Sequence, residues 1–186
     1  VYLLDEDGIV CAIDSKTGDE RWRQPTFVRT SSSPVVVDGM VYFGSEDNEA
    51  TALRTEDGEP QWRTRLSHES EETVAVTPDS VFATGGGNVT RLSTADGTIE
   101  WERQFDDVGQ LGSPTVAGDT VYVGSRSDGT VLALATGDGT ERWRVETRSV
   151  SFGDYTRSGV VDGPAVVDGV AYVATEPGEV YAIAEL

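Results

Sequence analysis

The segment AIDSKTGDERW, residues 12–22, decides the fold because its glycine and tryptophan recur along the chain. Gly18 stands four residues before Trp22, and this pair returns at intervals of about 40 residues. The later pairs are Gly58 with Trp62, Gly97 with Trp101, and Gly139 with Trp143. A pattern kept in register at this interval predicts one structural unit repeated along the chain. The units run over residues 1–40, 41–80, 81–120 and 121–170, with a partial unit at 171–186.

Each unit divides into short alternating segments separated by turn signals. Dipeptides such as Asp38-Gly39 and Asp168-Gly169 are typical of tight hairpins, because Asp and Gly tolerate a positive φ. No segment sustains a helical period. Four short antiparallel strands in each unit predict an all-β fold, a β-propeller of four-stranded blades.

We name the strands of a blade A to D in chain order. The sequence begins at a strand B and reaches a strand C, which predicts about four and a half blades. An open ring would leave strand edges unpaired and invite association. We therefore expect either a piece of a longer propeller or a ring completed by a second copy, and the absence of Met at position 1 favours a piece or a processed chain.

Residues 12–22 resemble the tryptophan-docking motif Ala-x-Asp-x-x-Thr-Gly-x-x-x-Trp of the PQQ-like (quinoprotein-type) repeat family. Ser32–Val36 and Val121–Ser125 resemble the inner strands of the same family. The similarity covers the whole chain, although only the Gly-x-x-x-Trp core persists in every unit. The chain is similar to the assembly-factor branch of the family. This resemblance implies an extracytoplasmic or cell-surface propeller that presents loops to protein partners. A cytoplasmic location stays open.

The motif itself has a structural interpretation. An indole packed on the neighbouring blade buries a large apolar surface, and the glycine permits the tight C–D turn. We expect Asp14 and Thr17 to hold that turn by bonds from side chain to backbone. All four tryptophans are therefore predicted to dock blades and not to stack on a ligand.

The family that this chain resembles also contains quinone-dependent dehydrogenases, so the resemblance makes that activity a second possibility. They hold PQQ between a tryptophan and a disulfide of adjacent cysteines, with a calcium ion and an Asp base. Cys11 is the only cysteine, so that disulfide cannot form, and every tryptophan is assigned to docking. We expect no enzyme activity, no catalytic or cofactor-binding residue, and neither PQQ nor calcium. A PQQ-dependent dehydrogenase fragment and the sensor domain of a larger receptor or kinase are the alternatives.

Other candidate sites are weak. His68 lies between Ser67 and Glu69, and we expect a solvated loop histidine because a catalytic triad draws its members from separate elements. The acidic loops 5–8 and 46–49 lack the spacing of a calcium loop, so no metal site is predicted. Residues 85–87 are three glycines that precede neither a helix nor a Lys-Ser/Thr pair, which favours a hairpin over a phosphate cradle. Cys11 is expected to be a small buried hydrophobe.

Binding residues are expected on the B–C and D–A loops, which share one end of each blade and are long and irregular. The D–A loop 147–162 is the longest and carries both aromatic residues and arginines, the side chains enriched at recognition hot spots. The alternative is that the arginines pair with Asp128, Asp154 and Asp162. The candidate residues are Arg29, Arg126, Arg148, Phe152, Tyr155 and Arg157.

The charge excludes some partners. The chain carries 33 Asp and Glu against 14 Lys and Arg, a formal charge of -19, and Lys16 is its only lysine. Such a surface repels the phosphates of nucleic acids and anionic membranes. No apolar run approaches the roughly 20 residues of a membrane-spanning helix. Dispersed acidity almost without lysine predicts a halophilic protein of haloarchaeal type, because salt screens the self-repulsion.

Overall fold

The structure, a computed structural model, describes residues 1–5, 7–26, 29–30, 32–70, 72–153 and 155–184, and only the backbone of Phe152 and Tyr155. All regular elements in these ranges are β-strands. Contacts divide the chain into two compact units. The first comprises Val1–Ala83 and Thr90–Glu100, and the second comprises Thr84–Val89 and Trp101–Leu186.

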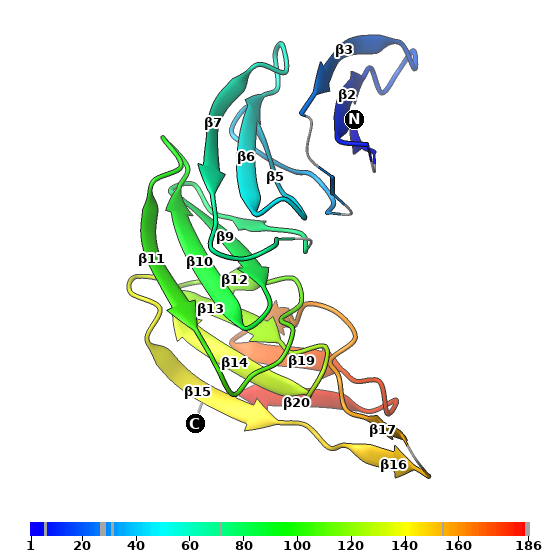
Figure 1. Cartoon of the computed structure of the whole chain (residues 1–186), viewed down its shortest axis with the longest axis vertical. Helices are drawn as coiled ribbons and strands as arrows, with labels where there is room; N and C mark the ends of the chain where they lie inside the picture. Colours follow the sequence, from blue (N-terminus) through cyan, green and yellow to red (C-terminus); the bar gives the residue numbers. More distant parts are fainter. Residues whose placement is uncertain (6, 27–28, 31, 71, 154, 185–186) are drawn as a thin grey trace. The chain divides into compact units, whose positions relative to one another are not determined.

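The first unit opens with a three-stranded sheet and a four-stranded sheet, in which each strand pairs with the next along the chain (Figure 1). The first sheet corresponds to strands B, C and D of a blade, and the second to a complete blade. Their strands are β1 (Tyr2–Leu4), β2 (Ile9–Ile13) and β3 (Glu20–Pro25), then β4 (Val35–Val37), β5 (Met40–Gly44), β6 (Glu49–Arg54) and β7 (Pro60–Arg65).

The third blade contributes residues to both units, and the fourth and last belong to the second. The third consists of β8 (Ala75–Val76), β9 (Ser80–Gly85), β10 (Asn88–Ser93) and β11 (Ile99–Gln104). The fourth consists of β12 (Thr115–Ala117), β13 (Thr120–Gly124), β14 (Thr130–Ala135) and β15 (Glu141–Glu146), and the last, with strands A to C, of β18 (Ala165–Val167), β19 (Val170–Ala174) and β20 (Val180–Ala184).

The turns form as the dipeptides predict. Asp38 and Gly39 have φ values of 47° and 79°, and Asp168 and Gly169 have values of 50° and 76°. Two successive residues with positive φ make a turn whose twist matches that of the flanking strands. The all-β blade architecture of the sequence analysis is confirmed.

The core lies between successive blades because their strands are apolar on both faces. Tyr42, Ala52 and Trp62 form one row across the second blade, and Val81 and Leu92 of the third blade belong to the same buried cluster. In the second unit, Tyr122, Ala133 and Trp143 form the corresponding row against Ala171 of the last blade. A sheet buried on both sides needs such near-continuous apolar strands.

Three expectations of the sequence analysis were wrong or incomplete. His68 is buried, with 7% exposure, because its ring lies between the Glu69 carbonyl oxygen, 2.8 Å from Nδ1, and Thr90 Oγ1, 2.9 Å from Nε2. Cys11 is only half-buried. The loop at 147–162 contains two further strands, β16 (Val150–Phe152) and β17 (Tyr155–Arg157), which pair as a separate ribbon.

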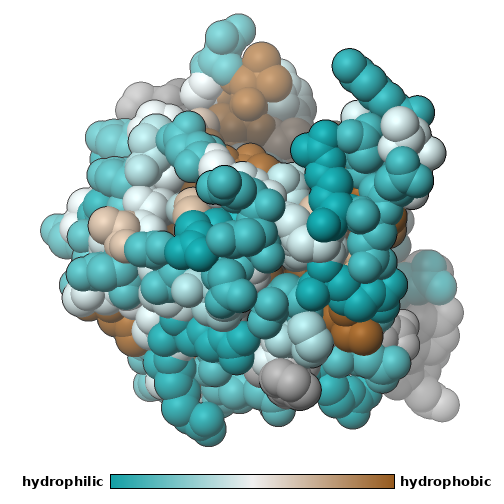
Figure 2. Space-filling view, turned by 90° about the horizontal axis from the view of Figure 1, so that it is seen from above, coloured by the Kyte–Doolittle hydropathy of each residue, from teal (hydrophilic) through white to brown (hydrophobic). Residues whose placement is uncertain are grey.

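The surface seen in Figure 2 is mostly hydrophilic, with a few hydrophobic patches among the polar residues. In the described part of the chain, no helix is long and apolar enough to cross a membrane.

Candidate binding site

The β16–β17 ribbon follows directly from the end of β15 (Figure 1). Its backbone pairs Val150 with Arg157, Ser151 with Thr156, and Phe152 with Tyr155. Gly153 has a φ of 62° and so permits the reversal between the strands. The sequence contains this signal, because Gly-Asp between two alternating three-residue segments is typical of a hairpin.

Both ends of the ribbon are fixed to the B–C turn of the fourth blade, at Ser125–Gly129. Before the ribbon, Thr147 donates its backbone N–H and its hydroxyl to the Gly129 carbonyl, at 3.1 Å and 2.8 Å. After it, the Ser158 hydroxyl donates to the Ser127 carbonyl at 2.8 Å. A Cβ on Gly159 would collide with the Arg126 carbonyl, so this close approach requires glycine. The ribbon therefore stands on a well-anchored base.

Arg148, at the start of the ribbon, is held by the last blade. Its backbone N–H donates to the Tyr181 hydroxyl at 3.0 Å, and that hydroxyl donates to Glu179 Oε2 at 2.6 Å. The Arg148 guanidinium lies 3.5 Å from Glu179 Oε1, and its side chain is 70% exposed. An exposed ion pair of this kind contributes little stability and leaves the guanidinium accessible to a partner.

The other candidate arginines are also exposed. Arg126 lies in the B–C turn that holds the ribbon, and Arg157 is the last residue of β17. Arg29 belongs to the first unit, where its Nε lies 3.8 Å from Glu46 Oε2 and its backbone N–H donates to Asp47 at 3.0 Å. The structure thus brings Arg126, Arg148 and Arg157 to one loop cluster of the second unit. The side chains of Phe152 and Tyr155 lie outside what the structure describes.

Two of the arginines, Arg148 and Arg29, have acidic partners other than the expected ones. Glu179 pairs with Arg148 and Glu46 with Arg29, whereas Asp128 accepts the backbone N–H groups of Gly109 and Thr130. Asp162 accepts the N–H of Gly163, and Asp154 lies outside the described residues.

At the opposite end of the blades, three tryptophans lie on the C–D turn of the following blade. Each donates its indole N–H to a carbonyl oxygen 2.9 Å away, and each ring faces the glycine of that turn, where an added Cβ would lie 2.6–2.9 Å from Cε3. The three sets are Trp22 with Thr55 and Gly58, Trp62 with Thr94 and Gly97, and Trp101 with Thr136 and Gly139.

Trp143 and Gly18 are not part of such a set in the described residues. Trp143 is half-buried, and its ring centroid lies 5.9 Å from that of Tyr122. The end of the last blade's strand C, from residue 185 on, is outside the described residues. A Cβ on Gly18 would meet nothing within 4 Å.

The motif around Asp14 is held by its carboxylate. Asp14 Oδ1 accepts the N–H of Lys16 at 2.8 Å and of Thr17 at 3.2 Å, while Arg21 donates to Oδ2 at 2.5 Å. The bond from Arg21 and those two N–H groups lower the pKa of Asp14 to about 2. Hydrogen bonds donated to the ionised carboxylate stabilise it and therefore lower its pKa.

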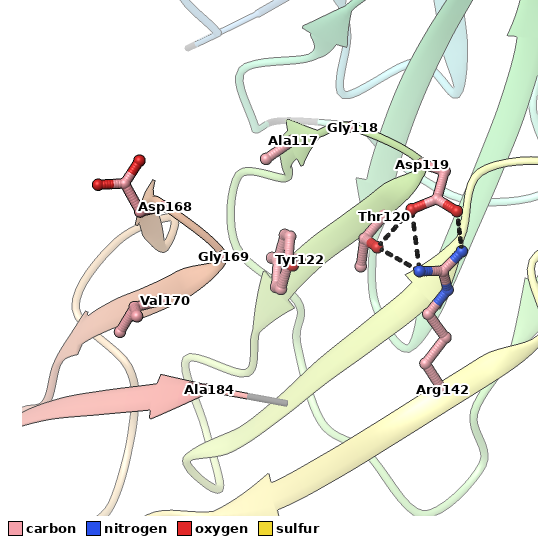
Figure 3. Close-up of a pocket in the computed structure, with 10 residues that line it drawn as sticks. All are labelled: Ala117, Gly118, Asp119, Thr120, Tyr122, Arg142, Asp168, Gly169, Val170 and Ala184. Atoms are coloured by element: carbon pink, nitrogen blue, oxygen red, sulfur yellow. Dashed lines mark hydrogen bonds and ion pairs between the residues drawn. The ribbon is translucent and has the colours of Figure 1, made fainter. Parts of the chain in front are cut away.

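A pocket of about 500 Å³ lies at the A–B end of the last two blades (Figure 3). The Arg142 guanidinium donates two hydrogen bonds to the Asp119 carboxylate there, at 2.9 Å and 2.6 Å, and a third to Thr120 Oγ1 at 2.8 Å. The contact with Arg142 lowers the pKa of Asp119. Asp168 lies on the other side of the pocket. Arg142, Asp119 and Thr120 thus hydrogen-bond to one another at this wall of the pocket. None of the three was a candidate site residue from the sequence.

The described side chains provide little for catalysis. They include no group of three or more His, Cys, Asp or Glu that could hold a metal ion. Both ring nitrogens of His68 are engaged, and no described serine lies within its hydrogen-bond contacts. The arrangement is suited to recognition by exposed arginines and a protruding ribbon.

Antiparallel blades of this repeat length, joined through tryptophan and glycine, define a β-propeller of PQQ-like repeats. The family model described as outer membrane protein assembly factor BamB matches residues 1–82 and 62–185. The chain belongs to this family, which confirms the resemblance found in the sequence.

Among sequence relatives, the outer membrane protein assembly factor BamB of Yersinia pestis is 28% identical over 98% of this chain. The alignment covers 51% of that relative, so the chain spans about half the length of the relatives it matches. The serine/threonine-protein kinase AfsK of Streptomyces griseus is 28% identical over 81% of this chain and 20% of its own length.

Solved structures show the same fold. The crystal structure of BamB from Moraxella catarrhalis has a TM-score of 0.80 at 20% identity, over 98% of this chain and 54% of that one. The quinohemoprotein alcohol dehydrogenase of Comamonas testosteroni has a TM-score of 0.69 at 15% identity, over 99% of this chain and 41% of that one. These likenesses concern the architecture, which catalytic and other propellers share.

Proposed function

We propose that this chain is a non-catalytic propeller segment that binds a protein partner through the loop end of its fourth blade. The observation that carries the proposal is the β16–β17 ribbon, an addition to the blade pattern that the B–C turn at Ser125–Gly129 anchors at both ends. Binding residues concentrate in such segments, held by a rigid scaffold.

The chemistry of the ribbon fits a protein surface. Arginines 126, 148 and 157 are exposed beside it, and the sequence places Phe152 and Tyr155 opposite each other in its backbone. Arginine and aromatic residues supply most binding energy at protein interfaces. In the described residues β16 and β17 pair with each other as a two-stranded sheet, a kind of element to which an extended segment of a partner can add a strand.

The family supports a protein partner and a position outside the cytoplasm. Relatives that match the whole chain are named as outer membrane protein assembly factors, although the chain spans about half of their length. The charge of -19 disfavours nucleic acids and anionic membrane surfaces, so neither is proposed as a partner. A second copy of the chain is a further proposed partner.

Two other functions are less well supported. A PQQ-dependent dehydrogenase fragment is favoured only by the shared fold, because Cys11 is the single cysteine and the described side chains form no metal cluster. A sensor domain is favoured by the alignment with the kinase AfsK over most of this chain. A kinase domain in the same reading frame would identify the sensor.

Site-specific crosslinking tests the proposal. A photoreactive amino acid is placed at Ser151 or Thr156, which are exposed on the ribbon, and at Glu56, which is exposed on a C–D turn, as the matched control. The proteins are irradiated at native salt in a cell-envelope extract of the source organism. We expect a discrete crosslinked protein from the ribbon positions and none from Glu56. Equal labelling from all three positions, or none from the ribbon, would contradict the proposal.

A partner identified in this way permits a second test. Arg148→Ala and Arg157→Ala should each weaken its binding by about tenfold, the effect of losing roughly 1.4 kcal/mol at a hot spot. Glu56→Ala should leave the affinity unchanged.

A further inference from the structure

The turn at residues 125–129, which anchors the ribbon, is also bound by the loop between β11 and β12. In that loop the Gly109 N–H donates to Asp128 Oδ2 at 2.5 Å, and the Gln110 N–H donates to Ser127 Oγ at 2.8 Å. The loop, the turn and the ribbon all belong to the second unit. The turn therefore connects a segment that precedes it in the sequence with the ribbon that follows it.

Glycines allow the close approach of both segments to the turn. A Cβ on Gly109 would collide with the Ser127 side chain, and a Cβ on Gly129 would collide with the Ser158 carbonyl oxygen. Glycine is the residue that lets a chain approach another this closely. Because the contacts are this tight, a displacement of the turn is passed on to the base of the ribbon.

Asp128 divides its two carboxylate oxygens between the turn and the loop. Its Oδ1 accepts the N–H of Thr130 at 2.8 Å, which is a bond within the turn, while its Oδ2 accepts the N–H of Gly109. Partial burial raises the pKa of this carboxyl, but the hydrogen bonds from Thr130 and Gly109 outweigh that effect, and the net pKa lies below the ordinary value. An ionised acceptor makes stronger hydrogen bonds than a neutral one.

We propose that Asp128 is a positioning residue of the binding site. Its bond to Gly109 fixes the turn to the preceding loop and thereby sets the orientation of the β16–β17 ribbon. This role rests on the proposed function of the ribbon. A segment held in one orientation before binding loses less conformational freedom when a partner binds to it.

Asp128→Asn separates the two bonds of the carboxylate. Asparagine forms the same local turn bond as aspartate, so it keeps the bond to Thr130 and turns its NH2 group toward the Gly109 N–H. Two donors then face each other and the link to the loop is lost. Ser127→Ala is a second variant, because it removes the acceptor of the Gln110 N–H but keeps the Ser127 carbonyl that holds Ser158.

Asp138→Asn is the matched control. Asp138 lies in the C–D turn of the same blade, where its Oδ1 accepts the N–H of Thr140 at 2.9 Å. This is the counterpart of the bond from Thr130 to Asp128, and asparagine preserves it. The control variant loses the same charge as Asp128→Asn without breaking this bond.

The orientation of the ribbon is measured by double electron–electron resonance. Cys11 is the only cysteine, so a Cys11→Ser background accepts two spin labels, at Thr156→Cys on the ribbon and at Glu141→Cys at the start of β15. We expect one narrow distance distribution in this background and in Asp138→Asn. Asp128→Asn and Ser127→Ala should each broaden it.

Hydrogen exchange gives a second measurement without labels. The amides of residues 150–157 should exchange about tenfold faster in Asp128→Asn and in Ser127→Ala, because losing one hydrogen bond of the anchor makes local opening easier. If Asp128 served its own turn alone, faster exchange would be confined to residues 125–130. Circular dichroism confirms that each variant is folded, and Ser127→Ala decides the question if Asp128→Asn does not fold.

A narrow distance distribution in the folded variants, or ribbon amides that exchange as in the wild type, would overturn the proposal. Equal broadening in Asp138→Asn would do the same. These measurements need no partner, so they are independent of the ribbon crosslinks. Crosslinks with a ribbon indifferent to Asp128 would refute the positioning role alone, whereas a ribbon fixed by Asp128 that gives no crosslinks would refute the proposed function.

Discussion

The indole of Trp22 lies against Gly58, a residue of the next blade, so closely that a Cβ at Gly58 would stand 2.6 Å from Cε3 of the ring. Gly58 also has a φ of 76°. The recurrent glycine of the motif is therefore required twice, for the turn and for the approach of the ring. Gly18 has a φ of 78°, and among the described residues no atom lies within 4 Å of an added Cβ, so the turn is the requirement that these residues place on it.

This pair of glycines separates the two requirements. Gly18→Ala and Gly58→Ala both place a side chain at positive φ, but only Gly58→Ala displaces a tryptophan. We expect Gly58→Ala to lower the free energy of unfolding by about 1–3 kcal/mol more than Gly18→Ala, the usual cost of overpacking. Urea unfolding of both variants measures the difference. Equal effects would show that the glycine serves the turn alone.

Loss of a docked indole should be costly. Trp62 is 7% exposed and donates to the Thr94 carbonyl, so Trp62→Ala should lower the free energy of unfolding by about 3–5 kcal/mol. Trp143 is half-buried, and Trp143→Ala should cost less. Urea unfolding of the two variants measures the difference. A larger loss for Trp143→Ala would contradict the assignment of docking by burial.

The Asp14 carboxylate should make stability depend on acid pH. Its pKa is lowered to about 2 in the folded chain from an ordinary 3.8, so its contribution is present above the ordinary value and is lost as pH falls toward 2. Asp14→Asn should melt below the wild type at pH 6, and the gap should close by about pH 2. Asp19→Asn, which removes one charge from the same turn, is the control. A gap that stays constant would count against the role of Asp14.

The acidic surface should make stability depend on salt. Because the charge of -19 repels itself in the compact state, the melting temperature should climb steadily from 0.1 M to 3 M KCl. Replacing the exposed Glu56, Glu59 and Glu69 by glutamine should flatten that slope. A melting temperature indifferent to KCl would refute the halophilic interpretation.

Local patterns in the sequence predicted the blades well. Asp38-Gly39 and the recurrent Gly-x-x-x-Trp act through backbone geometry at short range, so their consequences can be read from neighbouring residues. Asp38-Gly39 lies between β4 and β5, where the dipeptide predicts a tight hairpin. The ribbon at Val150–Arg157 was missed although its hairpin signal is local, because its segments are only three residues long.

The candidate site was harder to predict because its contacts are made between distant segments. Arg148 pairs with Glu179 through the support of Tyr181, and the burial of His68 depends on Thr90 of another strand. No periodicity joins such residues.

The claim that this propeller segment is not a dehydrogenase is tested most directly by titrating the chain with PQQ and calcium in molar KCl. Absorption of the protein fraction after gel filtration and dye reduction with alcohol substrates are the two measurements. We predict no bound chromophore and no alcohol-dependent reduction. Stoichiometric PQQ together with dye reduction would contradict the account.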